Sequence, residues 1–432
     1  MNSVFEEEKA VKAVLVAVCL EGESAEEVEI SLGELSLLLE TAGGEEFSRL
    51  VQNKENPDPR TYLGSGKVKE LAELCKNNEI GLVIFDDELS PSQIKCLEDD
   101  LTGKKGGIRV LDRTMLILDI FALHAKTAAG KMQVELAQLK YTIPRLTGKG
   151  NELSRLGGGI GTRGPGESKL ESDRRHLKRR IAALEEELDK LDRVNRTKRK
   201  ARDQSGIPLF AIAGYTNAGK STLLNYLTDA GILAENKLFA TLDPTTRAYT
   251  LPNGSEILLT DTVGFIRNLP HHLIKAFRST LDEVVSCDAL LLVIDGSDPN
   301  ALSQKEVTEK LLADLGAGEK PVLTVYNKCD LGILPLPHVS GEEDENVFRV
   351  SAKTGEGMEE LIAGIERHVS KTKKETSFLF PMNDQKKLDL LYRNGNVINV
   401  EYTDTHVKVT ALADAVLRGQ LADYISEREE NR

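Results

Sequence analysis

Apolar residues along the first part of the chain follow two alternating spacings. Continuous runs at 13–20 and 81–85, rich in valine and isoleucine, are typical of strands buried on both faces of a parallel sheet. Apolar residues at 31–40 and 68–75 recur instead at the spacing of an amphipathic helix. This alternation predicts a small α/β domain over residues 1–114.

Two long helical stripes come next. The first runs from Leu118 to Ile143 and the second from Leu177 to Val194, both in steps of three and four. Each stripe predicts one long helix. Joined by a connector, the two helices predict an antiparallel coiled-coil hairpin over 115–205.

The connector, at about 147–172, is rich in glycine and in positive charge. Its glycines cannot hold a regular helix, and a loop of this length is usually functional or disordered. Between Arg145 and Arg202 the chain holds 17 Lys/Arg and 9 Asp/Glu, a balance of +8 in a chain whose net charge is −13. A basic projection on an acidic protein is a candidate surface for nucleic-acid phosphates, and a solvated helix pair is the alternative interpretation.

Composition narrows the class of protein. The 432 residues include 40% hydrophobic side chains, enough for packed cores in about three domains. There is neither a run of 18 apolar residues nor an apolar leader, so we expect no membrane insertion. The five cysteines lie at no metal-binding spacing, which indicates reduced thiols and a cytoplasmic protein.

A strand run at 210–213 leads directly into a glycine-rich loop and then an apolar helix. The loop fits G-x-x-x-x-G-K-[ST], in which backbone N–H groups and the helix N-terminus bind phosphates. Lys220 supplies charge for the β- and γ-phosphates, and Ser221 supplies a Mg²⁺ ligand. The predicted nucleotide contacts in this segment are Gly214, Tyr215, Thr216, Asn217, Ala218, Gly219, Lys220, Ser221 and Thr222.

Three more segments follow strand runs in the order expected of a GTP-binding domain over 206–370. Asp261 can reach Mg²⁺ through water, and the N–H of Gly264 can meet the γ-phosphate. Asp330 can accept hydrogen bonds from guanine N1–H and the N2 amine, two donors that adenine lacks. The predicted contacts in these segments are Asp261, Thr262, Val263, Gly264, Asn327, Lys328, Asp330, Ser351, Ala352 and Lys353.

The segment between the phosphate loop and Asp261 should hold the switch threonine. Thr245 is the predicted Mg²⁺ and γ-phosphate contact, with Thr246 as the alternative, and Phe239 and Thr241 are predicted nucleotide contacts. Lys220, Thr245 and Gly264 are the predicted catalytic residues. A turn at 253–254, of the Asn-Gly type, predicts one antiparallel edge strand on a mostly parallel sheet.

Two departures from the commonest GTPase pattern affect mechanism. Phe265 stands where many small GTPases have the glutamine that orients the attacking water, so unaided hydrolysis should be slow. Arg247 and Arg267 could supply positive charge to the phosphates during hydrolysis. The more ordinary interpretation is that both side chains are solvated. Asn217 can help coordinate a cation such as K⁺ beside the phosphates, or can bond only the loop backbone.

The final segment carries two strand-like runs, at 396–402 and 405–410, between apolar helical patterns. This arrangement predicts a small α+β domain over 371–432. No catalytic or binding motif can be recognised in the sequence of this segment.

These residues together resemble a known family, the HflX-type GTPases of the translation-factor-related class. The glycine-rich connector and the Thr-Leu-Asp-Pro-Thr switch are its most specific features, since generic GTPases lack both. The matching motifs are Tyr62–Lys67, Val110–Thr114, Gln133–Leu139, Gly157–Glu167, Asp173–Arg175, Phe239–Thr245 and Asp261–Phe265.

The resemblance implies a GTPase that binds the large ribosomal subunit, is stimulated there, and separates stalled or idle ribosomes under stress. A GTPase acting on tRNA modification or as an RNA chaperone is the alternative. Some members of the family also hydrolyse ATP, and a second nucleotide site in the N-terminal domain has been suggested for the family; in this chain the segment 64–67 is too short for a phosphate loop and is better interpreted as a capped helix start. We expect a monomer when the protein is free. The residues implied in ribosomal RNA binding are Arg155, Gly157, Gly158, Gly159, Thr162, Arg163, Arg174 and Arg175.

Overall fold

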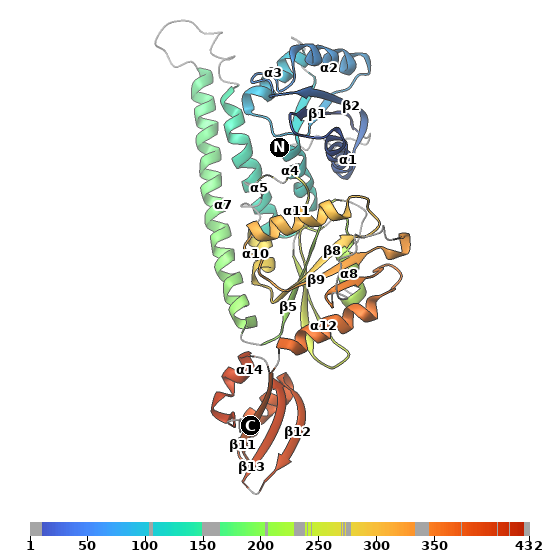
Figure 1. Ribbon diagram of the computed structural model, residues 1–432. Helices are drawn as coiled ribbons and strands as arrows, with labels where there is room; N and C mark the ends of the chain where they lie inside the picture. The colour runs from blue at the N-terminus through green and yellow to red at the C-terminus, as the bar shows by residue number, and fades with distance from the viewer. Residues whose placement is uncertain are drawn as a thin grey trace. The chain divides into compact units, whose positions relative to one another are not determined.

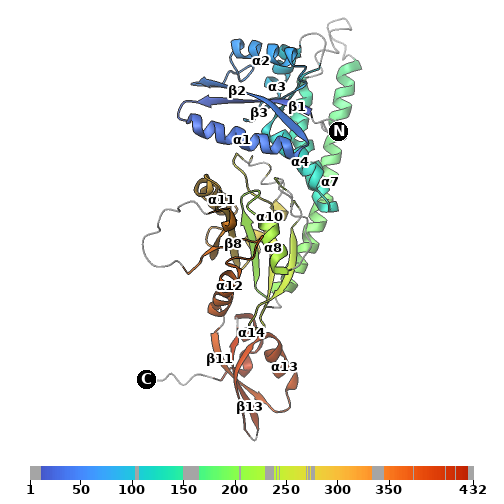
Figure 2. The same ribbon diagram turned by 90° about the vertical axis from the view of Figure 1, so that its right-hand side faces the viewer.

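The computed structural model divides into two compact units. The first comprises residues 1–191, 235–243 and 267–278, and the second comprises 192–234, 244–266 and 279–432. Figures 1 and 2 show the elements of each unit, and no helix in the described part of the chain is long and apolar enough to cross a membrane. The structure describes residues 11–426 except 103–106, 149–164, 204–205, 229–237, 240, 243, 269, 271–272, 274–277, 333–344, 373, 404 and 414.

The first unit contains a four-stranded parallel sheet in the order β2-β1-β3-β4. The two predicted strands are present as β1 and β3. The edge strand β2 was not predicted, because only one of its faces is covered and its sequence therefore lacks a continuous apolar run. The strands are β1 (Val11–Leu20), β2 (Gly44–Lys54), β3 (Leu82–Phe85) and β4 (Arg109–Asp112), and the helices between them are α1 (Ala25–Thr41), α2 (Ser65–Asn77) and α3 (Pro91–Thr102).

The prediction of one continuous helix from the first stripe was wrong. The structure has α4 (Arg113–His124) and α5 (Ala128–Thr142), followed by a 3-10 turn, η2 (Ile143–Gly148). Thr127 ends the continuity because its hydroxyl accepts a hydrogen bond from the N–H of Gly130 and caps α5. The apolar period continues across this break, so the spacing alone does not show it.

The hairpin partner of α5 is α7 (Pro165–Asp203), a helix of 39 residues. Ion pairs of 2.7 Å join Arg180 to Glu135 and Lys140 to Glu185, and α5 and α7 lie side by side in Figure 1. α7 begins inside the segment that was expected to be connector, at a proline, which is favourable in the first turn of a helix. The division between the two units falls within α7, after Leu191.

The second unit contains a six-stranded sheet in the order β10-β9-β8-β5-β7-β6. Every neighbouring pair is parallel except β6 with β7, so the predicted antiparallel edge strand is confirmed. The strands are β5 (Leu209–Gly214), β6 (Thr245–Thr250), β7 (Glu256–Asp261), β8 (Ala289–Asp295), β9 (Val322–Asn327) and β10 (Val347–Arg349), and the helices are α8 (Lys220–Thr228), α10 (Arg278–Ser286), α11 (Ala301–Asp314) and α12 (Met358–Thr372).

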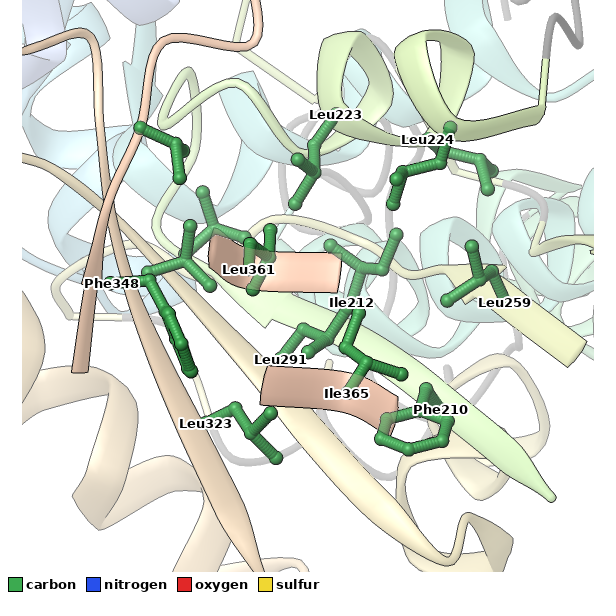
Figure 3. Close-up of a cluster of buried hydrophobic side chains, with 14 of the residues drawn as sticks. Phe210, Ile212, Leu223, Leu224, Leu259, Leu291, Leu323, Phe348, Leu361 and Ile365 are labelled. Carbon is green, nitrogen blue, oxygen red and sulfur yellow. The ribbon is translucent and has the colours of Figure 1, made fainter. Parts of the chain in front are cut away.

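The core of this sheet is mostly aliphatic, with Phe210 and Phe348 among its buried side chains. Ile212 and Leu291, from the central strands β5 and β8, are fully buried. In Figure 3, Leu223 and Leu224 from α8 and Leu361 from α12 converge on the same strands. Burial of this apolar surface stabilises the sheet whose edge carries the polar residues described below.

The last part of the chain forms a three-stranded antiparallel sheet in the order β11-β13-β12. The α+β prediction for this part is confirmed, although its first strand was not predicted. Phe378 and Phe380 on that strand are fully buried, with ring centroids 6.1 Å apart. The elements are β11 (Lys374–Pro381), α13 (Gln385–Asn394), β12 (Asn396–Tyr402), β13 (His406–Ala413) and α14 (Ala415–Gln420).

A buried arginine organises the carboxyl edge of the first sheet. The side chain of Arg113 is 2% exposed and donates to Asp86 Oδ1 at 2.5 Å and to Glu34 Oε2 at 2.8 Å. A third contact, of 3.1 Å, goes to the hydroxyl of Ser31. Removing one partner of such a buried group is costly because the remaining charges lose their compensation.

We therefore predict that Arg113→Ala destabilises the first unit by about 3–5 kcal/mol, since it leaves two carboxylates without their buried cation. Hydrogen exchange of the peptides covering β3 and β4, followed by mass spectrometry, measures this local free energy. Arg60→Ala is the matched control, because Arg60 pairs with Asp100 at the surface, where an ion pair contributes little to stability. Equal effects of the two substitutions would contradict the prediction.

Candidate nucleotide-binding site

The loop after β5 is built around two glycines that approach other chain segments closely. Gly214 and Gly219 have φ of +154° and +95°. A Cβ on Gly214 would lie 2.1 Å from the carbonyl oxygen of Val293, and one on Gly219 would lie 2.2 Å from Asn327 Nδ2. Only glycine fits both positions, so the spacing of the motif follows from steric requirements.

Lys220 is held inside this loop. Its ammonium donates to the carbonyl oxygen of Tyr215 at 2.8 Å, and the residue is 6% exposed. Burial lowers the pKa of Lys220 to about 8, and the charge of Asp261 acts in the opposite direction. A buried cation at a helix N-terminus is the arrangement that receives phosphate oxygens.

Ser221 and Asp261 form the candidate Mg²⁺ site. The Ser221 hydroxyl donates to Asp261 Oδ2 at 2.6 Å, and Asp261 is fully buried at the end of β7. A hydroxyl and a carboxylate oxygen this close fit a hard divalent cation, because Mg²⁺ prefers oxygen ligands. In the sheet, Thr245 is the register partner of Asp261, so the predicted switch threonine begins strand β6 beside this site.

The segment after Asp261 lies directly on the phosphate loop. The N–H of Thr216 donates to the carbonyl of Phe265 at 2.8 Å, and the N–H of Phe265 donates to the carbonyl of Gly214 at 3.1 Å. A Cβ on Gly264 would lie 3.0 Å from Lys220 Nζ. Phe265 itself is 2% exposed, so its ring fills space beside the loop and offers no polar group to water.

The base-binding segments are tied to the phosphate loop by one side chain. Asn327 donates through Nδ2 to the carbonyl of Ala218 at 2.9 Å and accepts through Oδ1 from the N–H of Ala352 at 2.9 Å. The hydroxyl of Ser351 donates to Asp330 Oδ1 at 2.7 Å. These contacts hold the Asp330 carboxylate in one orientation, which is what recognition of guanine requires.

Sequence reasoning missed Asp295, which positions the predicted base-contacting lysine. Asp295 Oδ2 receives the ammonium of Lys328 at 2.6 Å, and its Oδ1 accepts the hydroxyl of Ser297 at 2.6 Å. The available signal was that Asp295 is the first polar residue after the apolar run of β8. Parallel strands end at the same sheet edge, so a polar residue there belongs near the others.

Other predicted residues lie elsewhere in the structure. Phe239 and Thr241 belong to the first unit, where the Phe239 ring packs edge-to-face on Phe121 with centroids 4.8 Å apart. Thr246, the alternative switch residue, shares a 2.5 Å contact with the hydroxyl of Thr260. The nucleotide contacts predicted at Phe239 and Thr241 stay predictions.

The two candidate cis arginines make local contacts. Arg247 is exposed and donates to the carbonyl of Thr246, its chain neighbour. Arg267 lies in the first unit, 3.7 Å from Glu34. The role of either arginine in hydrolysis stays a prediction.

The predicted RNA-binding residues divide into two groups. Arg174 and Arg175 are exposed on α7. The remaining six lie outside the described residues: Arg155, Gly157, Gly158, Gly159, Thr162 and Arg163.

The mostly parallel sheet, its phosphate loop, the Ser221–Asp261 pair and the Asp330 carboxylate together define a P-loop GTPase. The chain is 48% identical over 414 residues to GTPase HflX of Caldanaerobacter subterraneus subsp. tengcongensis, covering 96% of this chain and 94% of that protein. It is 41% identical to GTPase HflX of Escherichia coli over 78% of this chain and 79% of that one. The chain belongs to the HflX GTPase family.

Three family models agree with this membership. The matched models are described as GTP-binding GTPase N-terminal, at 29–122, GTP-binding GTPase Middle Region, at 124–202, and 50S ribosome-binding GTPase, at 209–328. A GTP-binding protein from the archaeon Sulfolobus solfataricus, in complex with GDP, is 27% identical, with a TM-score of 0.43 over 84% of this chain and 99% of that one. The chain is thus a GTPase that binds GTP and GDP and hydrolyses GTP, and P-loop GTPases generally use Mg²⁺.

We predict that Asp330→Asn weakens GDP binding by about 10- to 100-fold, because it replaces charge-assisted hydrogen bonds to guanine with an amide that presents an NH₂ to the N2 amine. Xanthosine diphosphate, which carries a carbonyl at that position, should bind the variant better than the wild type does. Competition against a fluorescent nucleotide measures both affinities. The control is Asp314→Asn, an exposed carboxylate on α11. An unchanged preference for GDP would show that Asp330 does not contact the base.

Proposed function

We propose that this chain is a cytoplasmic, ribosome-associated GTPase that binds the large ribosomal subunit and dissociates stalled or idle ribosomes under stress. Hydrolysis of GTP is stimulated by the ribosome in this proposal. The model matched at 209–328, described as 50S ribosome-binding GTPase, supports the choice of partner. Assignment of Thr245 and Gly264 to the γ-phosphate and of Ser221 and Asp261 to Mg²⁺ is part of the same proposal.

The observation that carries the proposal is the basic stretch at Arg145–Arg202, +8 on a chain of net charge −13. Arg174 and Arg175 are exposed on its helix α7. Exposed arginines on a long helix can contact phosphates, which anchor a protein on nucleic acid without reading its sequence. An acidic protein whose positive charge is concentrated in this one stretch would contact a large RNA through that stretch.

The buried ring of Phe265 supports dependence on that partner. Phe265 is fixed to the phosphate loop through its backbone, and it has no polar group to orient the attacking water. Turnover by the free protein is then slow, and a group from the ribosome or a rearranged loop completes the site. In this scheme the GTP state binds the large subunit in competition with the small one, and hydrolysis releases the protein.

Asn217 supports a role for a monovalent cation. Its φ of +61° places it at a sharp bend of the phosphate loop. We propose that its amide oxygen coordinates K⁺ beside the phosphates and so adds positive charge there.

The test of the proposed function is GTP hydrolysis with and without purified large subunits in K⁺ buffer. We expect strong stimulation of the wild type. Arg174→Ala/Arg175→Ala should weaken subunit binding and lower the slope of log affinity against log salt by up to about 2, since each lost phosphate contact removes about one unit.

Lys69→Ala/Lys76→Ala is the control, because it removes two exposed charges from α2. Equal loss of binding in both variants would point to net charge alone. Absence of stimulation, with co-sedimentation on tRNA in place of large subunits, would favour the alternative of a GTPase acting on tRNA modification or as an RNA chaperone.

We also predict faster hydrolysis in K⁺ than in Na⁺ at equal ionic strength. Asn217→Ala should abolish this difference, because the substitution removes the amide oxygen proposed to bind the ion. Steady-state phosphate release in the two salts measures it, with GDP affinity as the check that the loop is intact. Equal wild-type rates in K⁺ and Na⁺ would exclude the cation site.

A further inference from the structure

Thr216, the third residue of the phosphate loop, is enclosed within the nucleotide site. The residue is 7% exposed, and its hydroxyl oxygen Oγ1 has no hydrogen-bond partner among the described residues. Its backbone N–H is already used, because it donates to the carbonyl oxygen of Phe265 at 2.8 Å. A buried hydroxyl that stays unpaired costs free energy, so its presence here calls for a partner from outside the chain.

The side chain of Thr216 lies where two expected γ-phosphate contacts meet. A Cβ built on Gly264 would lie 2.8 Å from Thr216 Cγ2 and 3.0 Å from Lys220 Nζ. One point beside Gly264 is therefore close to both the threonine side chain and the lysine ammonium. Because the hydroxyl and the methyl group of threonine are attached to the same carbon, the hydroxyl of Thr216 is also close to this point.

Backbone contacts hold these residues together. The N–H of Phe265 donates to the carbonyl oxygen of Gly214 at 3.1 Å, and Tyr215 and Phe265 form an isolated parallel bridge. All of these residues belong to the second unit. The position of the Thr216 side chain relative to Gly264 is thus set by contacts within one unit.

A hydroxyl at this place has a chemical use that the loop backbone does not supply. In GTPases the loop lysine and the glycine after the Mg²⁺-site aspartate approach the γ-phosphate, which GTP carries and GDP lacks. A threonine hydroxyl can donate one hydrogen bond, and a bond to a charged phosphate oxygen is stronger than one between neutral groups. A donor close to both Lys220 and Gly264 would therefore meet GTP and GDP differently.

We infer that the hydroxyl of Thr216 donates a hydrogen bond to a γ-phosphate oxygen of bound GTP and so favours GTP over GDP. This inference rests on the proposed assignment of Gly264 to the γ-phosphate and does not depend on the ribosomal partner. It specifies the nucleotide contact predicted at Thr216, where the backbone N–H is held by Phe265 and the side chain is the remaining donor.

The experiment measures binding of GDP, and of the GTP analogue with an imido β,γ bridge, to full-length Thr216→Val. Valine keeps the branched shape of threonine and removes the hydroxyl. Affinity for the analogue should fall by about 10-fold or more, because a hydrogen bond to a charged group is lost, and GDP affinity should be unchanged. Thr216→Ala should show the same selective loss, and Thr216→Ser, which keeps the hydroxyl, should restore most of the analogue affinity.

Two further variants serve as controls. Thr308 is 1% exposed on α11, and its hydroxyl donates to the carbonyl oxygen of Gln304 at 2.8 Å, within its own helix. Thr308→Val removes a buried hydroxyl away from the phosphate loop and should bind both nucleotides as the wild type does. Gly264→Ala places a methyl carbon 3.0 Å from Lys220 Nζ and should lower affinity for the analogue.

Each outcome decides the question. Unchanged analogue affinity in Thr216→Val, with a loss in Gly264→Ala, overturns the inference and leaves the assignment of Gly264 standing. Unchanged affinity in both variants overturns both. An equal loss of analogue and GDP affinity in Thr216→Val, or a serine variant as weak as the valine variant, shows a structural role of the side chain and overturns the inference. Stimulation by large subunits is a separate measurement, so the proposed ribosomal partner stands or fails independently.

Discussion

The side-chain amide of Asn327 is the contact on which the rest of the nucleotide site depends. It donates to the phosphate loop at Ala218 and accepts from the base-binding loop at Ala352, so it fixes the separation of the two. This contact requires glycine at position 219, where a Cβ would lie 2.2 Å from the amide nitrogen. The amide of Asn327 and the glycine at position 219 thus fix the relative positions of the loops that carry Lys220 and Asp330.

The site is well ordered for binding nucleotide but lacks a side chain that would orient water for hydrolysis. The groups that bind nucleotide are buried and oriented: Lys220 within the loop, Ser221 on Asp261, and Ser351 on Asp330. The position that orients water in many GTPases holds a buried phenyl ring, Phe265. A site that is ready to bind and slow to react suits a switch whose timing is controlled from outside.

The strands of the central sheets could be predicted where burial on both faces produces a continuous apolar run, as in β1, β3 and β5. The edge strand β2 could not, since a half-covered strand has a mixed sequence. The break between α4 and α5 could not be predicted either, because the apolar period continues across it, whereas in the structure Thr127 accepts a hydrogen bond from Gly130 and begins a new helix. Similarly, Asp295 is an ordinary acidic residue in the sequence and becomes part of the site through its contact with Lys328.

The sequence alone determined the class of protein, because phosphate, Mg²⁺ and guanine recognition each depend on a short segment at a strand end. Only glycine fits at positions 214 and 219, and recognition of guanine requires a carboxylate at position 330. Few other residue types could therefore stand at these positions. The tertiary structure decided which distant segments meet. It placed Phe239 against Phe121 and paired Arg199 and Arg202 with Glu283. Such contacts join residues far apart in the chain, and their charges and rings look the same in a sequence whether they are solvated or buried against a partner.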